Sequence, residues 1–188
     1  IATDLGIVRD DRTAIRTAIG GALDAGADCI VVSGGASVGD YDLTKPVLTE
    51  MDAALDFYKI AMRPGKPFMF GAIEKTNRKA FIMGLPGNPV SSIVCSHLFL
   101  SHLIRRMQDD HQEPILFNGT LSVSVLENDQ REEYTRCVAE QTDSGDWSLT
   151  PFKRQDSSLL SVAAAANALM IRPAHDTARR AGDAVKFL

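Results

Sequence analysis

Several features that mark common classes of protein are scarce or missing in this sequence. Its 188 residues carry 20 lysines and arginines against 24 aspartates and glutamates, so no basic excess draws it to nucleic acid or an anionic membrane. No apolar run reaches the roughly 20 residues of a membrane-spanning helix, and no signal peptide is visible. No CxxC pair or zinc-like spacing occurs among its few cysteines and histidines (Cys29, Cys95, Cys137, His97, His102, His111 and His175). We therefore expect a cytoplasmic protein with reduced thiols.

The remaining composition is that of an ordinary globular protein. Hydrophobic residues make up 45% of the chain and charged residues 23%. The length fits one large domain or two small ones. Because the chain begins IATDLGIV, without methionine and partway through an element, we expect a fragment with upstream sequence missing.

The first 107 residues alternate between helical and strand patterns. The spacing of Ile15, Ile19 and Leu23 predicts a helix over residues 11–25, with Asp10 or Asp11 as its cap. Further helices are predicted over residues 43–51 and, after Asn88-Pro89, to about residue 107. Strands are predicted in CIVVS (29–33, continuously apolar and so buried on both faces), FYKIAM (57–62), FMFGAI (68–73) and AFIMGL (80–85), the last two joined by a hairpin. The alternation favours a mainly parallel sheet covered on both faces, with the hairpin strands at one edge.

The pattern changes at the polar stretch QDDHQEP (108–114), which is a linker candidate. Beyond it the chain becomes mainly β. Strands are predicted in LSVSVLE (121–127), EYTRCVA (133–139), DWSLTPF (146–152) and near the C-terminus, with a short helix in LLSVAAAANAL (159–169). We therefore expect an α/β domain over residues 1–110 and a small all-β domain over residues 111–188.

Three loops that follow strands could carry chemistry, since ligands of open α/β sheets sit beyond the carboxyl ends of the strands. The first is SGGASVGDYD (33–42). Its glycines, Gly34, Gly35 and Gly39, permit close approach of a ligand to the backbone. Asp40 and Asp42 offer hard oxygen ligands for Mg²⁺. A tight turn with an N-cap aspartate explains the loop equally well.

The second loop, KIAMRPGKP (59–67), gathers three cations in an otherwise acidic chain. Lys59, Arg63 and Lys66 lie within eight residues of each other, and the Pro-Gly-Lys-Pro turn is stiff enough to hold Lys66 in place. Such a set suits an oxyanion or a phosphate. The alternative is a solvated charged turn.

The third loop is GLPGNPVSS (84–92). Pro86 and Pro89 bracket a Gly87-Asn88 turn, from which Asn88 can cap a helix that starts at Pro89. The helix start would present the backbone N–H groups and hydroxyls of Ser91 and Ser92 to an anion. Simple helix capping is the alternative, but it leaves the preceding Gly-Leu-Pro-Gly without a reason.

In this order, SGGASVGDYD, RPGKP and GLPGNPVS resemble the molybdopterin-binding domain of MoeA-type molybdopterin molybdenumtransferases, which include the carboxyl-terminal part of gephyrin. The tail QDSSLLSVAAAANALMIRP is similar to the family's Gln-x-Ser and Ala-Asn-(Gly/Ala)-Leu segments. The resemblance covers essentially the whole chain. It implies a three-layer α/β/α domain, whose first strand would lie upstream, followed by a small β-barrel.

The resemblance also implies an activity. Family members bind adenylated molybdopterin and, with Mg²⁺, insert molybdate at its dithiolene and release AMP. They form homodimers, and a related adenylyltransferase makes their substrate. By resemblance, Asp42 is the required aspartate, Asp40 lies beside it, and both are metal-ligand candidates. Lys59 and Arg63 lie near the anionic substrate. The expected substrate-binding residues are Ser33, Gly34, Gly35, Ser37, Gly39, Lys66, Pro86, Gly87, Asn88, Pro89, Ser91 and Ser157.

The chain departs from the family's pattern in two places. The family's Thr/Ser-Gly-Asp-Glu loop and amino-terminal domains are absent, so we expect this portion to be inactive alone. Asp156 and Ser158 stand where small residues are common. Two other functions remain open: an adenylyltransferase of the same fold, which normally lacks the barrel, and a peptide-binding scaffold, for which the 6% aromatic content is low.

Overall fold

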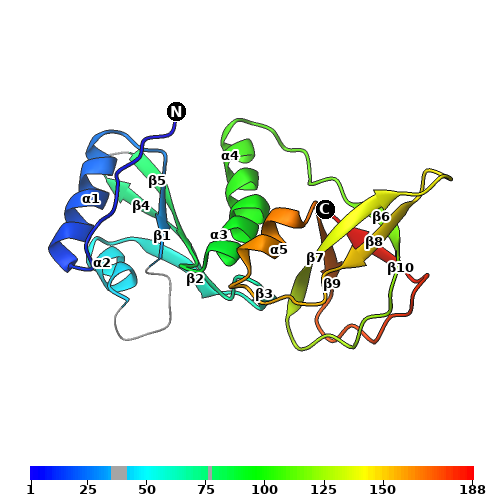
Figure 1. The fold of residues 1–188 in the computed structure, drawn as a ribbon. Helices are drawn as coiled ribbons and strands as arrows, with labels where there is room; N and C mark the ends of the chain where they lie inside the picture. Colours follow the sequence, from blue (N-terminus) through cyan, green and yellow to red (C-terminus); the bar gives the residue numbers. More distant parts are fainter. Residues whose placement is uncertain (35–41, 76–77) are drawn as a thin grey trace. The chain divides into compact units, whose positions relative to one another are not determined.

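The structure is a computed structural model, and it describes residues 1–34, 42–75 and 78–188 (Figure 1). The chain forms two compact units. The first comprises residues 1–60 and 67–87, and the second comprises residues 61–66 and 88–188. Because compact units need not coincide with domains, the boundary near residue 110 stays a prediction.

A four-stranded mixed sheet forms the centre of the first unit. Its order is β1 (Cys29–Ser33), β5 (Arg78–Leu85), β4 (Pro67–Lys75) and β2 (Ala54–Lys59). In this sheet β1 and β5 are parallel, whereas β4 is antiparallel to both β5 and β2. The prediction of a mostly parallel sheet with its hairpin at an edge was therefore wrong. The links from β2 to β4 and from β4 to β5 are too short for the crossover that parallel strands need, so the hairpin occupies the middle of the sheet.

Two helices pack on one face of this sheet, as Figure 1 shows. In α1 (Arg12–Asp24), Asp11 caps the N-terminus by accepting from the Ala14 N–H at 2.9 Å. Buried residues of α1 and of α2 (Thr44–Glu50) join those of the strands in one core (Ile15, Ile19, Ala22, Val47, Leu48, Ile30, Met69, Ile73, Ala80 and Ile82). Both predicted helices are confirmed, but CIVVS is not buried on both faces, because Val31 of the edge strand β1 is 42% exposed.

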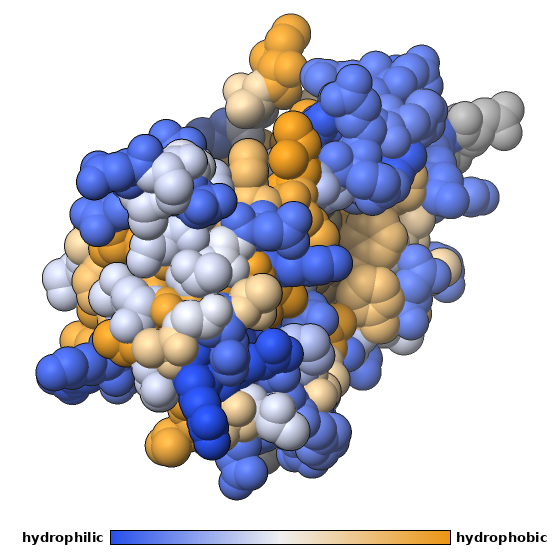
Figure 2. Space-filling view, turned by 90° about the vertical axis from the view of Figure 1, so that its right-hand side faces the viewer, coloured by the Kyte–Doolittle hydropathy of each residue, from blue (hydrophilic) through white to orange (hydrophobic). Residues whose placement is uncertain are grey.

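The second unit contains the long helix expected after Asn88. It runs as α3 (Pro89–Cys95), a π-helical turn η1 (Ser96–Leu100) and α4 (Ser101–Met107). Val90, Val94 and Cys95 are buried, whereas Ile93 and Ile104 are exposed. The face of the molecule in Figure 2 shows hydrophobic groups set among hydrophilic ones. Within the described residues, no helix combines the length and apolar character needed to cross a membrane.

The rest of the second unit is a closed β-barrel. Its strands follow the order β7 (Glu132–Gln141), β8 (Trp147–Pro151), β6 (Phe117–Leu121), β10 (Ala184–Phe187) and β9 (Ala168–Arg172), and the pairing of β9 with β7 closes the ring. The short strand β3 (Met62–Arg63) adds to β7 in parallel. The core is lined by Leu121, Cys137, Ala139, Leu149, Ala168, Met170 and Phe187. The α/β region followed by an all-β barrel is thus confirmed, and the third layer of the α/β region stays a prediction.

Three strand predictions need correction. Strand β6 ends at Leu121, so LSVSVLE is not a strand; Val125 makes only an isolated bridge to Arg179, and Leu126 is 84% exposed. The alternation of apolar and polar residues in LSVSVLE does not come from a strand with one buried face. The neighbouring strands β8 and β10 pair only with residues up to Leu121. FYKIAM is divided between β2 and β3. Strand β9 was missed, because the alanine run before it suggested only a helix, which the structure does contain as α5 (Leu160–Ala165).

Candidate functional site

The first and third loops meet at the carboxyl ends of two parallel strands. Ser33 of β1 pairs with Leu85 of β5, and the next residue, Gly34, donates its N–H to the Leu85 carbonyl at 3.3 Å. Gly34 has a φ of +82°, which favours glycine. A Cβ built on Gly87 would lie 3.5 Å from the Gly34 Cα. The two glycine turns are therefore packed against each other, and within the described residues no side chain lies within 4 Å of a Cβ built on either glycine.

Of the two aspartates in the first loop, Asp42 lies within the described residues, and both of its carboxylate oxygens accept hydrogen bonds. Oδ1 accepts from the Thr44 N–H at 3.1 Å, and Oδ2 accepts from the Tyr58 hydroxyl at 2.9 Å. Burial raises the pKa of Asp42, and these hydrogen bonds oppose the increase. Burial and the neighbouring carboxylate raise the pKa of Tyr58 to about 12, so the phenol remains a donor at neutral pH. Asp42 does not cap α2, since its partner is the N–H two residues on, as in an Asx turn.

Gly35, Ser37, Gly39 and Asp40 lie outside the described residues, so their predicted roles stay predictions. Among the described residues, no group of three or more His, Cys, Asp or Glu side chains is arranged to hold a metal ion. One carboxylate is nevertheless a common protein contribution to a Mg²⁺ site, since the ion keeps several waters and takes further oxygens from substrate phosphates. The Thr44 N–H and the Tyr58 hydroxyl donate to different oxygens of Asp42, and a carboxylate has about four lone-pair sites. The donor set therefore fits the ion.

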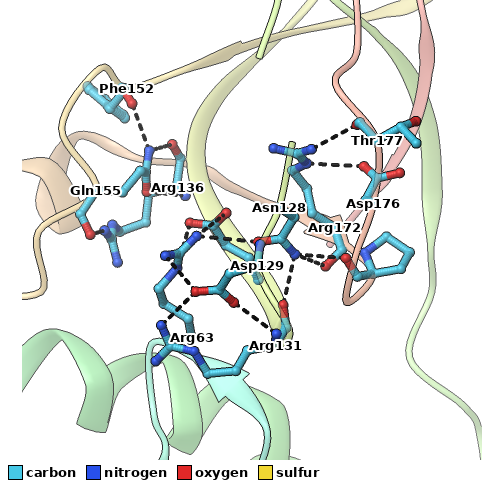
Figure 3. A network of polar contacts seen from close by, with 12 residues as sticks. Arg63, Asn128, Asp129, Arg131, Arg136, Phe152, Gln155, Arg172, Asp176 and Thr177 are labelled. Atoms are coloured by element: carbon cyan, nitrogen blue, oxygen red, sulfur yellow. Dashed lines mark hydrogen bonds and ion pairs between the residues drawn. The ribbon is translucent and has the colours of Figure 1, made fainter. Parts of the chain in front are cut away.

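The three cations of the second loop divide between the two units. Lys59 ends β2 in the first unit and is exposed, as is Lys66 in the second. Arg63 is ion-paired: its guanidinium lies 2.9 Å from Glu133 and 3.3 Å from Asp129. Figure 3 shows Arg63 beside Asp129. Arg131, and secondarily Arg63, holds the pKa of Asp129 at about 2. The charge of Arg63 is thus compensated within the barrel unit, and a shared action of the three cations on one ligand stays a prediction.

The third loop leads into α3 through a side-chain cap. Asn88 Oδ1 accepts from the Ser91 N–H at 3.2 Å and from the Ser91 hydroxyl at 3.4 Å. Pro86 is buried, whereas Gly87 and Pro89 are exposed. Ser91 is only 6% exposed, so its hydroxyl faces Asn88 rather than solvent. The predicted cap is confirmed, and the binding of an anion at this helix start stays a prediction.

Substitutions at Asn88 separate capping from ligand binding. We expect Asn88→Ala to lower the free energy of unfolding by about 1 kcal/mol, because the Ser91 N–H loses its acceptor. Asn88→Asp keeps an acceptor at the same place and should retain stability, but its negative charge should weaken the binding of an anion. Urea unfolding of both variants checks the first expectation, and titration with an anionic substrate checks the second. Equal stability of the alanine variant and the wild type would contradict the capping role.

Ser157 lies half-buried in the segment between β8 and α5, which is held by its neighbour Gln155. The Gln155 amide pairs with the Arg136 backbone as a strand would: Oε1 accepts from the Arg136 N–H, and Nε2 donates to the Arg136 carbonyl, both at 2.9 Å. Nε2 also donates to the Phe152 carbonyl at 2.8 Å. These contacts, drawn in Figure 3, fix the Gln-x-Ser segment against β7.

Arg136 itself is a candidate that the sequence interpretation missed. Its side chain donates to the Gln155 carbonyl and is only 2% exposed, and Nε and Nη1 have no hydrogen-bond partner among the described residues. Burial lowers its pKa, while Glu133 and Asp156 oppose the shift. A buried guanidinium with unpaired N–H groups has hydrogen-bonding capacity left for an anion. The sequence signal that could have identified Arg136 is the position of this charged residue inside the predicted strand EYTRCVA.

Comparisons with known proteins agree with this arrangement. Residues 2–106 match the family described as "Probable molybdopterin binding domain", and residues 118–188 match the family described as "MoeA C-terminal region (domain IV)". The chain is similar to a molybdopterin molybdenumtransferase of Haemophilus influenzae, with 36% identity over 71% of this chain and 32% of that protein. It is similar to another from Nostoc sp., with 38% identity over 54% of this chain and 23% of that protein.

Among solved structures, a molybdopterin biosynthesis MoeA protein from Pyrococcus horikoshii shares 26% identity and superposes with a TM-score of 0.74. The match covers 97% of this chain and 42% of that one. The matched segments cover 32% and 23% of the two molybdenumtransferases, so the chain spans well under two thirds of the length of these relatives.

Proposed function

The chain belongs to the family described as "Probable molybdopterin binding domain", and from this membership we propose that it serves molybdenum cofactor biosynthesis as the substrate-binding part of a molybdopterin molybdenumtransferase. The proposed substrates are adenylated molybdopterin and molybdate. The proposed reaction inserts the metal at the dithiolene and releases AMP. The observation that carries the proposal is Asp42, a carboxylate that accepts from the Thr44 N–H and the Tyr58 hydroxyl, in the loop that follows a parallel strand.

The residues divide into those that approach the substrate and those that compensate its charge. The packed turns at Gly34 and Gly87 allow a ligand to lie against the backbone. Lys59, an exposed cation of the same unit as Asp42, can offset the charge of molybdate and phosphate. The second unit carries its own cations, the exposed Lys66 and the buried Arg136. Arg63, already paired with Glu133 and Asp129, contributes less net charge.

Asp42, with Asp40 beside it in sequence, would hold Mg²⁺. A bound Mg²⁺ supplies positive charge that polarises a phosphoryl oxygen. Asp42 must therefore stay ionised and oriented, which its hydrogen bonds from Thr44 and Tyr58 favour. The proposal includes a cytoplasmic homodimer that takes its substrate from a separate adenylyltransferase.

The β-barrel separates this proposal from the main alternative. An adenylyltransferase of the same fold normally lacks such a domain, whereas residues 118–188 form a closed barrel and match the MoeA C-terminal region. The molybdenumtransferase is therefore the function that we propose.

Calorimetry with adenylated molybdopterin tests the proposal. We expect the protein as its gene encodes it to bind this ligand, and to bind it at least about 10-fold more tightly with Mg²⁺ than with EDTA, because an ion held by Asp42 would supply positive charge for an anionic ligand. The Haemophilus influenzae enzyme provides the positive control. Absence of binding, or binding indifferent to Mg²⁺, would overturn the proposed substrate or the proposed metal, respectively.

A further inference from the structure

Tyr58 lies 16 residues from Asp42 in the sequence and contacts the same carboxylate that the proposed function requires. It belongs to β2, whereas Asp42 precedes α2. The hydroxyl donates to Asp42 Oδ2 at 2.9 Å, and its aromatic ring packs against the core shared by α1, α2 and the sheet. The phenol is therefore anchored at its ring and directed at the carboxylate by its hydroxyl.

Strand β2 is irregular at this point. Its pairing with β4 shifts register between Leu55 and Phe57 and again between Phe57 and Lys59, and Tyr58 lies within the second of these intervals. Such irregularities re-aim a side chain relative to a regular strand. Phe57 stacks on Phe68 and Phe70, with centroids 5.9 Å away in each case, while Tyr58 packs against the core with α2. The departure from regular pairing thus coincides with the residue that reaches Asp42.

A second contact fixes the ring from the helix side. The Lys45 ammonium lies 4.4 Å from the centroid of the Tyr58 ring, within the range of a cation–π interaction. Lys45 belongs to α2, directly after Thr44, whose N–H holds the other oxygen of Asp42. One end of α2 and one residue of β2 therefore hold the carboxylate from both sides.

We propose that Tyr58 is a positioning residue, which orients the Asp42 carboxylate for a divalent metal ion. This inference rests on the proposed function. With Thr44 on Oδ1 and Tyr58 on Oδ2, rotation of the carboxylate about its Cβ–Cγ bond breaks at least one hydrogen bond. The remaining lone pairs are then held in a fixed direction before the ion arrives. Partners of this kind typically change metal affinity by about 10- to 100-fold when they are removed.

Binding of Mn²⁺, a paramagnetic substitute for Mg²⁺, tests the inference without relying on turnover. The protein as its gene encodes it is titrated with Mn²⁺ in the presence of saturating adenylated molybdopterin, and free Mn²⁺ is measured by electron paramagnetic resonance. We expect Tyr58→Phe to raise the Kd about 10- to 100-fold. Tyr134→Phe is the matched control, because it removes a hydroxyl that donates to Glu132 at 2.7 Å in the barrel, and its Kd should match the wild type.

A second variant covers the possibility that loss of the hydroxyl disturbs packing. Tyr58→His keeps a ring with an N–H donor, so its Kd should fall between those of the wild type and Tyr58→Phe. Urea unfolding of all variants confirms that they are folded. A Tyr58→Phe variant that binds Mn²⁺ like the wild type, while Asp42→Asn does not bind, would overturn the positioning role and leave the proposed function intact. Unchanged Mn²⁺ binding by Asp42→Asn would overturn the proposed metal site and, with it, this inference.

Discussion

Replacement of Asp42 by asparagine is expected to lower the rate of molybdenum insertion at least about 100-fold, the usual scale for loss of one aimed electrostatic group. Asparagine lacks the negative charge that would attract the metal ion. Its NH₂ group would also face one of two donors, the Thr44 N–H or the Tyr58 hydroxyl. The measurement is kcat and KM for insertion, in the protein as its gene encodes it. The loss should appear in kcat and also as a higher KM, since Mg²⁺ held by Asp42 is expected to tighten substrate binding as well.

Asp56→Asn is the matched control for this substitution. Asp56 is an exposed aspartate on β2 of the same unit, so the change in overall charge is the same. We expect its turnover to equal that of the wild type. Wild-type turnover in Asp42→Asn would mean that the metal-dependent step does not use this carboxylate, and the proposed function would lose its central residue.

The stability of the Asp42 variant distinguishes a lost function from a lost fold. Burial raises the pKa of Asp42, which means that the ionised form is less favourable in the folded chain than in the unfolded one. Such a group stabilises the fold below the unfolded pKa of about 3.9, and this contribution disappears as the pH rises through the folded value. Relative to Asp42→Asn, the wild type should therefore lose stability as the pH rises. Urea unfolding between pH 3 and 7 would show it, whereas marked instability of the variant at neutral pH would contradict it.

The sequence predicts the elements of this fold better than their pairing. Helices α1 and α2 and the cap at Asn88 follow from local signals, since a cap needs only neighbouring backbone groups. The mixed order of the first sheet does not follow, because the pattern of AFIMGL is the same for parallel and antiparallel partners. Strand β9 was not predicted, although its buried residues Ala168 and Met170 alternate with less buried ones as in a strand. The alanine run directly before it has high helix propensity and favoured a helix instead.

The candidate site shows the same limit. Asp42 and the glycine turns follow from a contiguous motif, whereas Tyr58 contacts Asp42 from 16 residues further along the chain, a contact that no local pattern encodes. Arg136 depends on a distant segment as well, since Gln155 pairs with its backbone from 19 residues away. Charge patterns in the sequence can also mislead. Arg63 looks like a free cation beside Lys59 and Lys66. Its charge is compensated by Glu133 and Asp129, which follow the predicted linker in the sequence.

The stiff turn that carries Lys66 depends on Gly65, and Gly65→Ala should cost about 3 kcal/mol or more of unfolding free energy. Gly65 has a φ of +117°, a conformation that costs a residue with a Cβ about 1–2 kcal/mol. The added Cβ would also lie 2.5 Å from the Cys95 Sγ, and overpacking of such a site costs about 1–3 kcal/mol. Neither neighbour has room to yield, since Cys95 is fully buried and Met62 is 4% exposed.

Gly182→Ala is the matched control, because Gly182 has a φ of +91° and no atom within 4 Å of a built Cβ. Gly182→Ala should be destabilised only by the strained backbone conformation. The difference between the two variants in the free energy of unfolding, measured with urea, therefore gives the cost of the contact with Cys95. Addition of Cys95→Ala to Gly65→Ala should restore part of the loss, since it removes the sulfur. Equal destabilisation of both glycine variants would show that the turn is not packed on α3. In that case the rigidity of Lys66, and its part in holding an anion, would have to come from the two prolines alone.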